Sequence, residues 1–302
     1  MTKRVYTLRP NEDWIVDRLV DEWNFYNSDM TTNEPKNADV VWLLANWCYR
    51  RIEPSLLKSK RVVTTIHHVV EDKFDISKRR DFEERDSFTD VYHVPNNHTE
   101  SFVKKLTRKP VVVIPYWANQ EIWKRTGDAA HFRLKYGLDV SKYTIGSWQR
   151  DTEGSDLKSP KLEKGPDLFL DFVKSMRDSK GRDNIHIVLA GWRRQYVMNG
   201  LNELGVTYDY FDRPSQAVVN ELYQCVDLYP VTSRCEGGPQ ALIECGLLQI
   251  PVVSRNVGIA SQVLPLESIN DNVSKAVPHV PSVEHLKMPL GFEEYRKLFQ
   301  NA

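Results

Sequence analysis

Short runs of apolar residues alternate with segments of helical periodicity along the chain. The runs are continuous and rich in β-branched residues, which is typical of strands buried on both faces of a parallel sheet. In the first half the predicted strands are Arg4–Leu8, Val40–Ala45, Val62–Ile66, Val91–Val94 and Val111–Ile114. In the second half they are Tyr143–Trp148, Ile185–Ala190, Val206–Phe211, Leu228–Val231 and Pro251–Ser254.

Between these runs, apolar residues recur at three- and four-residue spacing, which predicts amphipathic helices. Asn11 is a candidate N-cap for a first helix that reaches Tyr26, and Ser215 caps another helix through Cys225. The remaining helical segments are Thr99–Leu106, Asp167–Met176, Pro239–Leu248 and Gly291–Phe299. Two successive strand–helix series predict an α/β protein with two Rossmann-like domains.

The domain boundary is expected where this alternation is interrupted. Tyr116–Lys142 is mixed in charge and fits a connection between domains. We therefore predict an N-terminal Rossmann-like domain over residues 1–118 and a C-terminal Rossmann-like domain over residues 119–284. The C-terminal stretch of about residues 285–302 contains the last amphipathic segment, and we expect it to pack back on the first domain.

Charge and composition exclude several classes of protein. The 302 residues carry 41 Lys and Arg and 41 Asp and Glu, so a net charge of zero gives no global attraction to nucleic acid. The sequence contains no stretch of 18 apolar residues, so we expect no membrane span. The N-terminal residues become polar before they could form the apolar core of a signal peptide. The four cysteines show neither C-x-x-C nor zinc-ligand spacing. We expect reduced thiols in a cytoplasmic protein.

The segment with the most specific chemistry is Leu228–Val253, whose pattern is strand, loop, helix, strand. We expect Pro239 at the first helical position, where its missing N–H costs nothing. Gly237 and Gly238 before it let a ligand approach the backbone closely. The amides of Gly237–Gln240 at a helix N-terminus then form an anion site, for which phosphate is the usual guest.

Two carboxylates, Glu236 and Glu244, flank this anion site. A carboxylate beside a bound phosphate costs free energy unless it forms hydrogen bonds with another group. Hydroxyl groups on both sides of a diphosphate would provide such hydrogen-bond donors for the two carboxylates. A sugar on one side and a ribose on the other describe a nucleotide sugar. The alternative is a capping acid followed by an acid on a helix surface.

The same segment resembles the donor-site signature of retaining GT-B glycosyltransferases of family four, also called glycosyl transferases group 1. The matching residues are Glu236, Gly237, Gly238, Pro239, Glu244, Pro251, Val252 and Val253. Cys245 stands where alanine is usual, and the small residue and glycine that follow are displaced to Gly246 and Gln249. The resemblance implies a GT-B fold of two Rossmann-like domains facing across a cleft, with residues 1–118 as the acceptor-side domain and residues 119–284 as the nucleotide-sugar-binding domain. It also implies that Glu236 orients the donor sugar and that Glu244 holds the ribose.

A second resemblance to this family lies at Ile145–Gly165, where members carry an arginine and a lysine that reach the donor diphosphate. Arg150 and Lys164 match these positions. The spacer between them, TEGSDLKSPKLE, is longer than usual, so Lys158 and Lys161 are alternatives to Lys164. Asn256–Leu264 resembles the segment after the second glutamate, and the resemblance covers about residues 140 to 265.

The N-terminal half matches more loosely. His67, in the segment TTIHH, aligns with a histidine that the family aims at the donor sugar, and a histidine satisfied by backbone is the alternative. The glycine-rich loop of many members is replaced by RPNEDWIVD. The polar residues of that loop are candidates for acceptor or phosphate contacts: Arg9, Asn11, Glu12 and Asp13.

Tryptophans and charge runs give weaker signals. Trp14, Trp23 and Trp42 fit core positions, whereas an exposed indole at Trp47, Trp117 or Trp123 would stack on a sugar in the acceptor cleft. The charge run at residues 78–86, KRRDFEERD, predicts a solvated helix face. A contact of this run with a membrane surface would suit a lipid-linked acceptor.

The resemblance thus implies a retaining glycosyltransferase that moves a sugar from a nucleotide-diphosphate sugar to a hydroxyl of a glycan, glycolipid or small-molecule acceptor. No metal-ligand motif is present, so we expect no metal and no cofactor apart from the donor substrate. Basic side chains and a helix N-terminus would neutralise the leaving diphosphate. The alternatives are a nucleotide-sugar epimerase, and a GT-B-shaped binding protein or inactive partner subunit. A dehydrogenase is disfavoured because no G-x-G-x-x-G follows the first strand.

Overall fold

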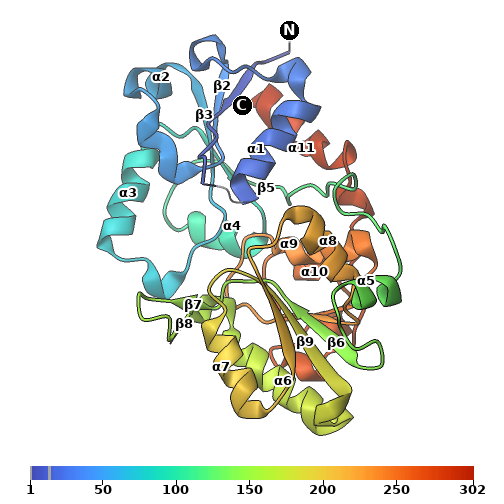
Figure 1. Ribbon diagram of the computed structural model, residues 1–302. Coiled ribbons are helices and arrows are strands. Elements are labelled where there is room, and N and C mark those ends of the chain that lie inside the picture. Colours follow the sequence, from blue (N-terminus) through green and yellow to red (C-terminus); the bar gives the residue numbers. More distant parts are fainter. Residues whose placement is uncertain (1, 13–14) are drawn as a thin grey trace. The chain divides into compact units, whose positions relative to one another are not determined.

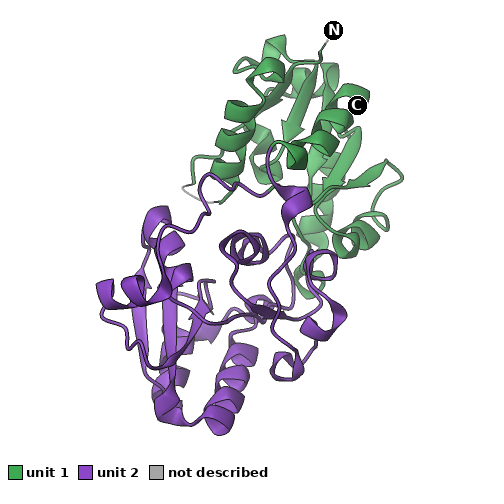
Figure 2. Ribbon diagram, turned by 90° about the vertical axis from the view of Figure 1, so that its right-hand side faces the viewer, with its two compact units in different colours: residues 1–117, 289–302 green, residues 118–288 purple. Residues whose placement is uncertain are grey.

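The computed structural model describes residues 2–12 and 15–302. Its contacts divide the chain into two compact units: unit 1 consists of residues 1–117 and 289–302, and unit 2 of residues 118–288 (Figure 2). The candidate acceptor contact Asp13 and the expected core residue Trp14 lie outside the described residues. In the described parts of the chain, no helix combines the length and the apolar character needed to cross a membrane.

Unit 1 is built on a parallel sheet of five strands, which lie side by side in sequence order. The strands are β1 (Val5–Thr7), β2 (Val40–Leu43), β3 (Arg61–Thr65), β4 (Val91–Val94) and β5 (Val111–Val113). All four neighbouring pairs are parallel. The carboxyl ends of these strands therefore meet at one edge of the sheet, where ligands of open α/β sheets bind.

Helices cover both faces of this sheet (Figure 1). They are α1 (Ile15–Tyr26), α2 (Pro54–Ser59), α3 (Ile76–Asp86), α4 (Asn97–Val103) and α11 (Glu293–Asn301). Aromatic side chains pack α1 and α11 against one face of the sheet. The ring centre of Trp23 lies 5.4 Å from that of Trp42 and 5.2 Å from that of Phe299. On the other face, Tyr49 and Leu57 pack with β2 and β3, and Phe82 packs with β4.

The start of α1 differs from the sequence prediction. Asn11 has a left-handed backbone (φ 59°), so it does not have the extended conformation of an N-cap. Instead Asp17, in the first turn, reaches back along the chain. Its carboxylate accepts from the backbone N–H of Asn11 at 2.8 Å and of Glu12 at 2.7 Å. An acid in the first turn also suits the positive end of the helix.

Unit 2 contains a three-stranded and a two-stranded parallel sheet that are joined by a parallel bridge between Ile145 and Leu228. The resulting order is β10 (Tyr208–Asp212), β9 (Ile185–Gly191), β6 (Tyr143–Ser147), β11 (Tyr229–Val231) and β12 (Val252–Ser254). The chain builds outward from β6 in one direction and then returns to build in the other. This is the doubly wound order of Rossmann folds, and its switch point lies between β6 and β11.

The helices of unit 2 are α5 (Ala129–Lys135), α6 (Pro166–Lys180), α7 (Gln195–Leu204), α8 (Gln216–Gln224), α9 (Gln240–Leu248) and α10 (Ala260–Val263). Apolar residues of α6 and α7, such as Phe172 and Leu201, form one core with β9. Ser215 caps α8 as predicted, with its hydroxyl accepting from Val218 N–H.

The long spacer after Arg150 forms an antiparallel hairpin of β7 (Thr152–Glu153) and β8 (Ser159–Pro160), which the sequence did not predict. A buried ion pair anchors it, because Arg194 Nε donates to Asp151 Oδ2 at 2.6 Å and both side chains are almost fully buried. The Arg194 guanidinium also donates to Ala190 O and to the Ser147 hydroxyl. One arginine therefore ties the end of β6, the end of β9 and the start of the hairpin together.

Candidate functional site

The carboxyl ends of β6 and β11 define the candidate site, because ligands of doubly wound sheets bind at the switch point. Gln149 and Arg150 follow β6 closely, and the loop at residues 232–238 follows β11. Lys164 precedes α6, which begins at Pro166. Three segments of the chain thus converge at one edge of unit 2.

A hydrogen-bonded network joins these segments. Lys164 Nζ lies 2.7 Å from Glu236 Oε2. The Ser233 hydroxyl lies 2.8 Å from Glu236 Oε1 and 3.0 Å from Gln149 Oε1, and its single proton serves one of them at a time. Gln149 Nε2 in turn donates to Lys164 O at 2.6 Å. The structure therefore brings the predicted Lys164 and Glu236 together and adds Gln149 and Ser233, which the sequence analysis missed.

Lys164 is placed by its neighbour Gly165, which packs directly on the loop after β11. Gly165 has φ 61°, and a Cβ there would lie 2.0 Å from Thr232 O. The Thr232 hydroxyl donates to Gly165 O at 3.0 Å. Only glycine allows this approach, so the K-G pair of the sequence fixes the lysine beside the glutamate.

Lys161, the alternative to Lys164, lies in the same cluster of cations but has another partner. Its Nζ lies 3.6 Å from Glu163 Oε1. Burial lowers the pKa of Lys161, Glu163 partly offsets this, and the positive charges of Arg150 and Lys164 lower the pKa further. Arg150, Lys161 and Lys164 therefore form one positive patch, in which Lys164 is the lysine joined to Glu236.

Arg150 is held at the rim of this patch by aromatic and backbone contacts. Its Nε donates to Thr152 O at 3.0 Å, and its guanidinium carbon lies 5.0 Å from the ring centre of Trp192. Arg193 approaches the same ring at 5.1 Å. Trp192 is half exposed and follows β9, so it belongs to the same sheet edge. The sequence analysis did not select Trp192, although its position after a predicted strand was a usable signal.

The glycine turn and α9 differ slightly from the prediction. Pro239 occupies the N-cap position with ψ 108°, and the helix begins at Gln240, so proline is not at the first helical position. Gly258 supports the turn from behind, because a Cβ there would lie 2.8 Å from Gly237 O and 2.4 Å from Pro239 Cδ. Gly237 and Pro239 are buried, and Gly238 between them is partly exposed.

Glu244 lies on α9 and is nearly buried, with 8% of its surface exposed. The Tyr223 hydroxyl donates to Glu244 Oε2 at 2.7 Å. Burial first, and then the charge of Glu244, raise the pKa of Tyr223 well above its usual value, so the phenol keeps its proton and serves as donor. Trp148 packs edge-on against Tyr223 with ring centres 5.3 Å apart. The second predicted carboxylate is thus oriented by an aromatic cluster.

The loop that carries Glu236 is clamped to α6 by an arginine. Arg234 makes a two-pronged ion pair with Asp167 at 2.7 and 2.6 Å. The backbone N–H of Arg234 also donates to Glu163 O at 2.9 Å. Planar pairs of this kind fix geometry as well as charge, so the loop between β11 and α9 is preorganised. No sequence motif pointed to Arg234, since its partner lies 67 residues away.

His67 follows β3 in unit 1, and both of its ring nitrogens have partners. Nε2 lies 2.8 Å from Leu44 O, and Nδ1 lies 2.5 Å from the Tyr116 hydroxyl. A carbonyl only accepts, so Nε2 carries the proton and Nδ1 accepts from Tyr116. Burial lowers the pKa of His67 to about 4, which keeps it neutral at pH 7. These contacts fit the alternative of a satisfied histidine, and its action on the donor sugar stays a prediction.

The tryptophans divide into buried and exposed ones. Trp23 and Trp42 are core residues, as expected. Trp117 and Trp123 expose only 2% and 4% of their surface, so neither is the exposed indole that the sequence analysis expected at one of three positions. Of the three candidates, Trp47 is 39% exposed and meets that requirement.

Trp47 is also linked to the polar N-terminal loop. Its Nε1 donates to Glu12 Oε1 at 2.8 Å, and its ring centre lies 5.7 Å from that of His67. In the same loop, Arg9 donates to Asn11 and pairs with Asp21. The loop and His67 therefore share the carboxyl edge of the unit 1 sheet with Trp47, as the sequence order implied.

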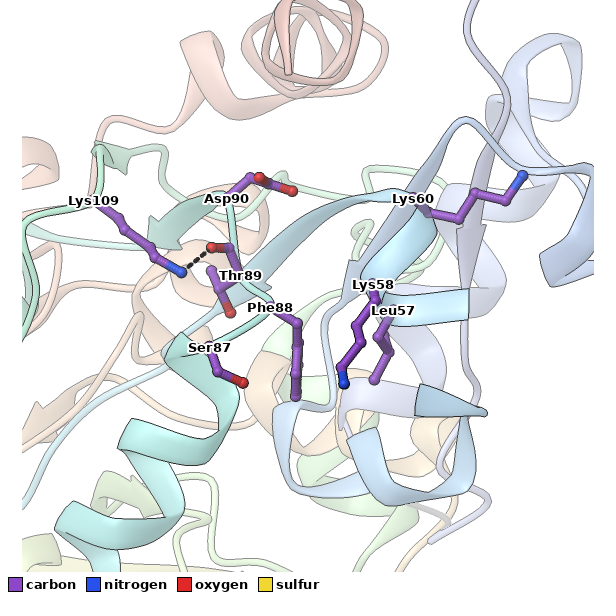
Figure 3. A pocket seen from close by; sticks show the side chains of 8 residues that line it. All are labelled: Leu57, Lys58, Lys60, Ser87, Phe88, Thr89, Asp90 and Lys109. Carbon is purple, nitrogen blue, oxygen red and sulfur yellow. Dashed lines mark hydrogen bonds between the residues drawn. The ribbon is translucent and has the colours of Figure 1, made fainter. Parts of the chain in front are cut away.

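A cavity of about 400 Å³ lies at the opposite edge of unit 1 (Figure 3). It is lined by residues that precede strands, among them Lys60 before β3, Asp90 before β4 and Lys109 before β5. Lys109 Nζ donates to Thr89 O, and Lys60 Nζ donates to Lys36 O. Because these ammonium groups serve backbone carbonyls at the amino ends of the strands, we do not assign the functional site here.

Comparison with known proteins establishes the fold. Among solved structures, HepE of Anabaena in complex with UDP and glucose matches with a TM-score of 0.67 and 12% identity over 88% of this chain and 83% of that chain. A glycosyltransferase from Rickettsia africae matches with a TM-score of 0.61 and 14% identity over 97% and 83%.

Sucrose-phosphate synthase from Thermosynechococcus elongatus matches with a TM-score of 0.59 and 14% identity over 97% of this chain and 75% of that chain. No family model matches the sequence, and no curated protein matches it. The chain therefore has the GT-B fold, a mixed α/β architecture with parallel sheets.

Within the described residues, no group of three or more His, Cys, Asp or Glu side chains is arranged to hold a metal ion.

Proposed function

We propose that the protein is a glycosyltransferase of family-four type that transfers a sugar, with retention, from a nucleotide-diphosphate sugar to an acceptor hydroxyl. The observation that carries this proposal is the Lys164–Glu236 pair at the switch point of unit 2. Lys164 supplies a cation for the leaving phosphate, and Glu236 beside it supplies a carboxylate for sugar hydroxyls. Glu236 directly precedes the turn before α9. The GT-B fold supports the same function, since HepE of Anabaena, which shares it, has been solved in complex with UDP-glucose.

In this function, Arg150 and Lys164 bind the diphosphate, and the amides of Gly237, Gly238 and Gln240 bind phosphate or sugar oxygens. Such groups stabilise the charge that develops on a leaving group without reorganising. Donor phosphate and Glu236 share Lys164, whose ammonium has three protons to donate. The Ser233 hydroxyl stays available to hold Glu236 toward the sugar.

For the transfer itself we propose a front-face displacement, which the resemblance to family four implies. The acceptor hydroxyl attacks the anomeric carbon on the face from which the diphosphate leaves, so the configuration is retained. The carbon–oxygen bond to the diphosphate breaks, and the hydroxyl proton passes to the departing phosphate oxygen. The products are the glycoside and the nucleoside diphosphate. Glu236 orients the sugar and Glu244 holds the ribose. His67 would contact the donor sugar only by exchanging its bond to Leu44 O or to the Tyr116 hydroxyl.

The test is incubation of the protein with a panel of nucleotide-diphosphate sugars, with and without candidate acceptors. Release of nucleoside diphosphate would be measured by chromatography, and the anomeric configuration of the product by NMR. We expect slow donor hydrolysis even without acceptor. An inverted product would refute the retaining mechanism, and absence of diphosphate binding in a thermal-shift screen would refute the donor class.

A second candidate function is a binding protein or partner subunit without turnover. It is favoured by the displaced residues after Glu244 and by a histidine whose ring nitrogens are both occupied. Binding of a nucleotide sugar without release of diphosphate, across the whole panel of acceptors, would support this alternative. Turnover that is lost in Glu236→Gln would exclude it.

A further inference from the structure

Arg150, at the rim of the positive patch in unit 2, is held by two contacts with its own chain. Its Nε donates to Thr152 O at 3.0 Å, and its guanidinium carbon lies 5.0 Å from the ring centre of Trp192. The first contact uses one N–H, and the second uses a face of the guanidinium. Neither contact uses the terminal Nη atoms, which form the planar fork that matches two phosphate oxygens.

The acceptor of the first contact, Thr152, is fixed by a buried network. The Thr152 hydroxyl donates to Asp151 Oδ1 at 2.6 Å and accepts from Tyr196 N–H at 2.9 Å. Asp151 Oδ2 accepts from Arg194 Nε at 2.6 Å, and the two side chains of this ion pair are 1% and 0% exposed. Breaking such a pair is costly, because it leaves one buried charge without compensation. The carbonyl that holds Arg150 Nε therefore has little freedom to move.

The indole of the second contact belongs to a constrained loop after β9. Gly191, directly before Trp192, has φ 98°. Arg193, directly after it, has φ 58°, a left-handed conformation that costs free energy for a residue other than glycine. The Arg193 carbonyl accepts from the backbone N–H groups of Asp151 and Thr152 at 3.2 and 3.1 Å. These bonds join the loop that carries Trp192 to the start of the hairpin.

Exposure distinguishes Trp192 from a packing residue. It keeps 50% of its surface exposed, and the guanidinium carbon of Arg193 also lies 5.1 Å from its ring centre. A cation over an aromatic face is attracted by the charge distribution of the ring. The indole therefore provides a flat surface for guanidinium groups at this edge of the sheet, whereas its burial contributes less to the core.

An arginine that is held in advance binds phosphate more tightly than a free one. A free arginine loses rotamer freedom when it binds a ligand, and that loss subtracts from the affinity. For Arg150, part of this freedom is already lost, because Nε and one face of the guanidinium are engaged. Its terminal nitrogens then meet a phosphate with little reorganisation.

We propose that Trp192 is a positioning residue, which holds Arg150 in the conformation that binds the donor diphosphate. The buried pair of Asp151 with Arg194 provides the fixed frame for this contact. Trp192 acts through Arg150 and does not itself touch the ligand. This inference rests on the proposed function, because it needs a diphosphate beside Arg150.

The test is a double-mutant cycle on nucleoside-diphosphate affinity, measured by calorimetry with the tightest binder among UDP, GDP and ADP. Trp192→Leu should weaken binding about fivefold, or ~1 kcal/mol, the size of an exposed cation–π contact. Trp192→Phe keeps an aromatic face and should stay within about twofold of the unaltered protein. Arg150→Ala should weaken binding about tenfold or more, and adding Trp192→Leu to it should cause no further loss.

The matched control is Phe25→Leu, which replaces an exposed aromatic residue of unit 1. It should change the affinity less than about twofold. Thermal unfolding shows that each variant is folded. A role of Trp192 in stability alone would lower the unfolding temperature of Trp192→Leu without weakening diphosphate binding by the folded protein.

Three results would overturn this inference and leave the proposed function intact. The first is an unchanged affinity in Trp192→Leu when Arg150→Ala weakens binding. The second is an equal loss in Trp192→Phe and Trp192→Leu. The third is a further loss when Trp192→Leu is added to Arg150→Ala, which would show that the indole touches the ligand. Failure of UDP, GDP and ADP alike to bind the unaltered protein would instead overturn the proposed donor class, and the role of Arg150 with it.

Discussion

Replacing Lys164 by alanine should weaken binding of a nucleoside diphosphate by roughly 10- to 30-fold. A charge-assisted hydrogen bond to phosphate contributes ~1.5–3 kcal/mol, which corresponds to roughly 10- to 150-fold in affinity. The lower part of this range applies for two reasons. The ammonium is already paired with Glu236 at 2.7 Å in the unliganded protein, so phosphate replaces or shares an existing partner. The lysine side chain also keeps 20% of its surface exposed, which admits screening by water.

The assay is calorimetric titration of UDP into the protein and two alanine variants. Lys161→Ala is the matched control, since this lysine belongs to the same patch but lies 3.6 Å from Glu163 rather than beside Glu236. We expect it to change UDP affinity less than threefold. Thermal unfolding of each variant shows whether it is folded. Normal UDP affinity in Lys164→Ala, together with a large loss in Lys161→Ala, would refute the assignment of Lys164 to the diphosphate.

Three further predictions concern the two glutamates, Gly165 and the buried histidines. Glu236→Gln should lower kcat by ~100-fold with nearly unchanged UDP affinity, whereas Glu244→Gln should weaken UDP binding by about tenfold or more. Steady-state rates and calorimetric titration of UDP check both variants. Equal effects of the two substitutions on UDP affinity would contradict the division of roles. Gly165→Ala should destabilise the protein by ~2 kcal/mol or more in urea unfolding, because its φ is positive and its Cβ would collide with Thr232 O; a loss below ~1 kcal/mol would show that the loop relaxes. Burial lowers the pKa of His93 to about 4 in the folded state, against an ordinary value near 6.5, so the unfolded chain takes up the proton first as pH falls. Stability should be unaffected above pH 6.5 and should fall by about 3 kcal/mol per such histidine between pH 6.5 and 4, with a shallower slope in His93→Asn.

The strands of both units were predictable because parallel strands buried on two faces are continuous apolar runs. The prediction Val91–Val94 coincides with β4, and Tyr143–Trp148 exceeds β6 by one residue. The expected GT-B fold is confirmed by its solved neighbours. Boundaries set by caps were less predictable. Asp17, an acid six residues after Asn11, binds that residue's N–H and replaces the cap that the local sequence indicated.

What the sequence could not predict are contacts between distant polar residues. The buried pair of Arg194 with Asp151 joins positions 43 residues apart, and neither residue stands in a pattern that separates it from a surface charge. The same holds for Arg234 and Asp167. Hydrophobic periodicity reports which face of an element is buried, but it carries no information on which polar groups meet. Those pairs depend on the order of strands in the finished sheet.

The choice between Lys158, Lys161 and Lys164 shows where such contacts support a proposed role. By sequence, Lys164 matched the family position, and Lys158 and Lys161 were alternatives because the spacer is longer than usual. In the structure the hairpin takes up that length, and the N–H of Lys161 donates to Asp151 O at 2.8 Å, which fixes where the spacer returns. The next turn is then closed by Gly165 against Thr232, and this contact places Lys164 beside Glu236. Gly165, which tolerates close backbone contact, therefore places Lys164 beside Glu236. If Lys164 binds the diphosphate as proposed, a substitution at Gly165 should impair diphosphate binding as well as stability.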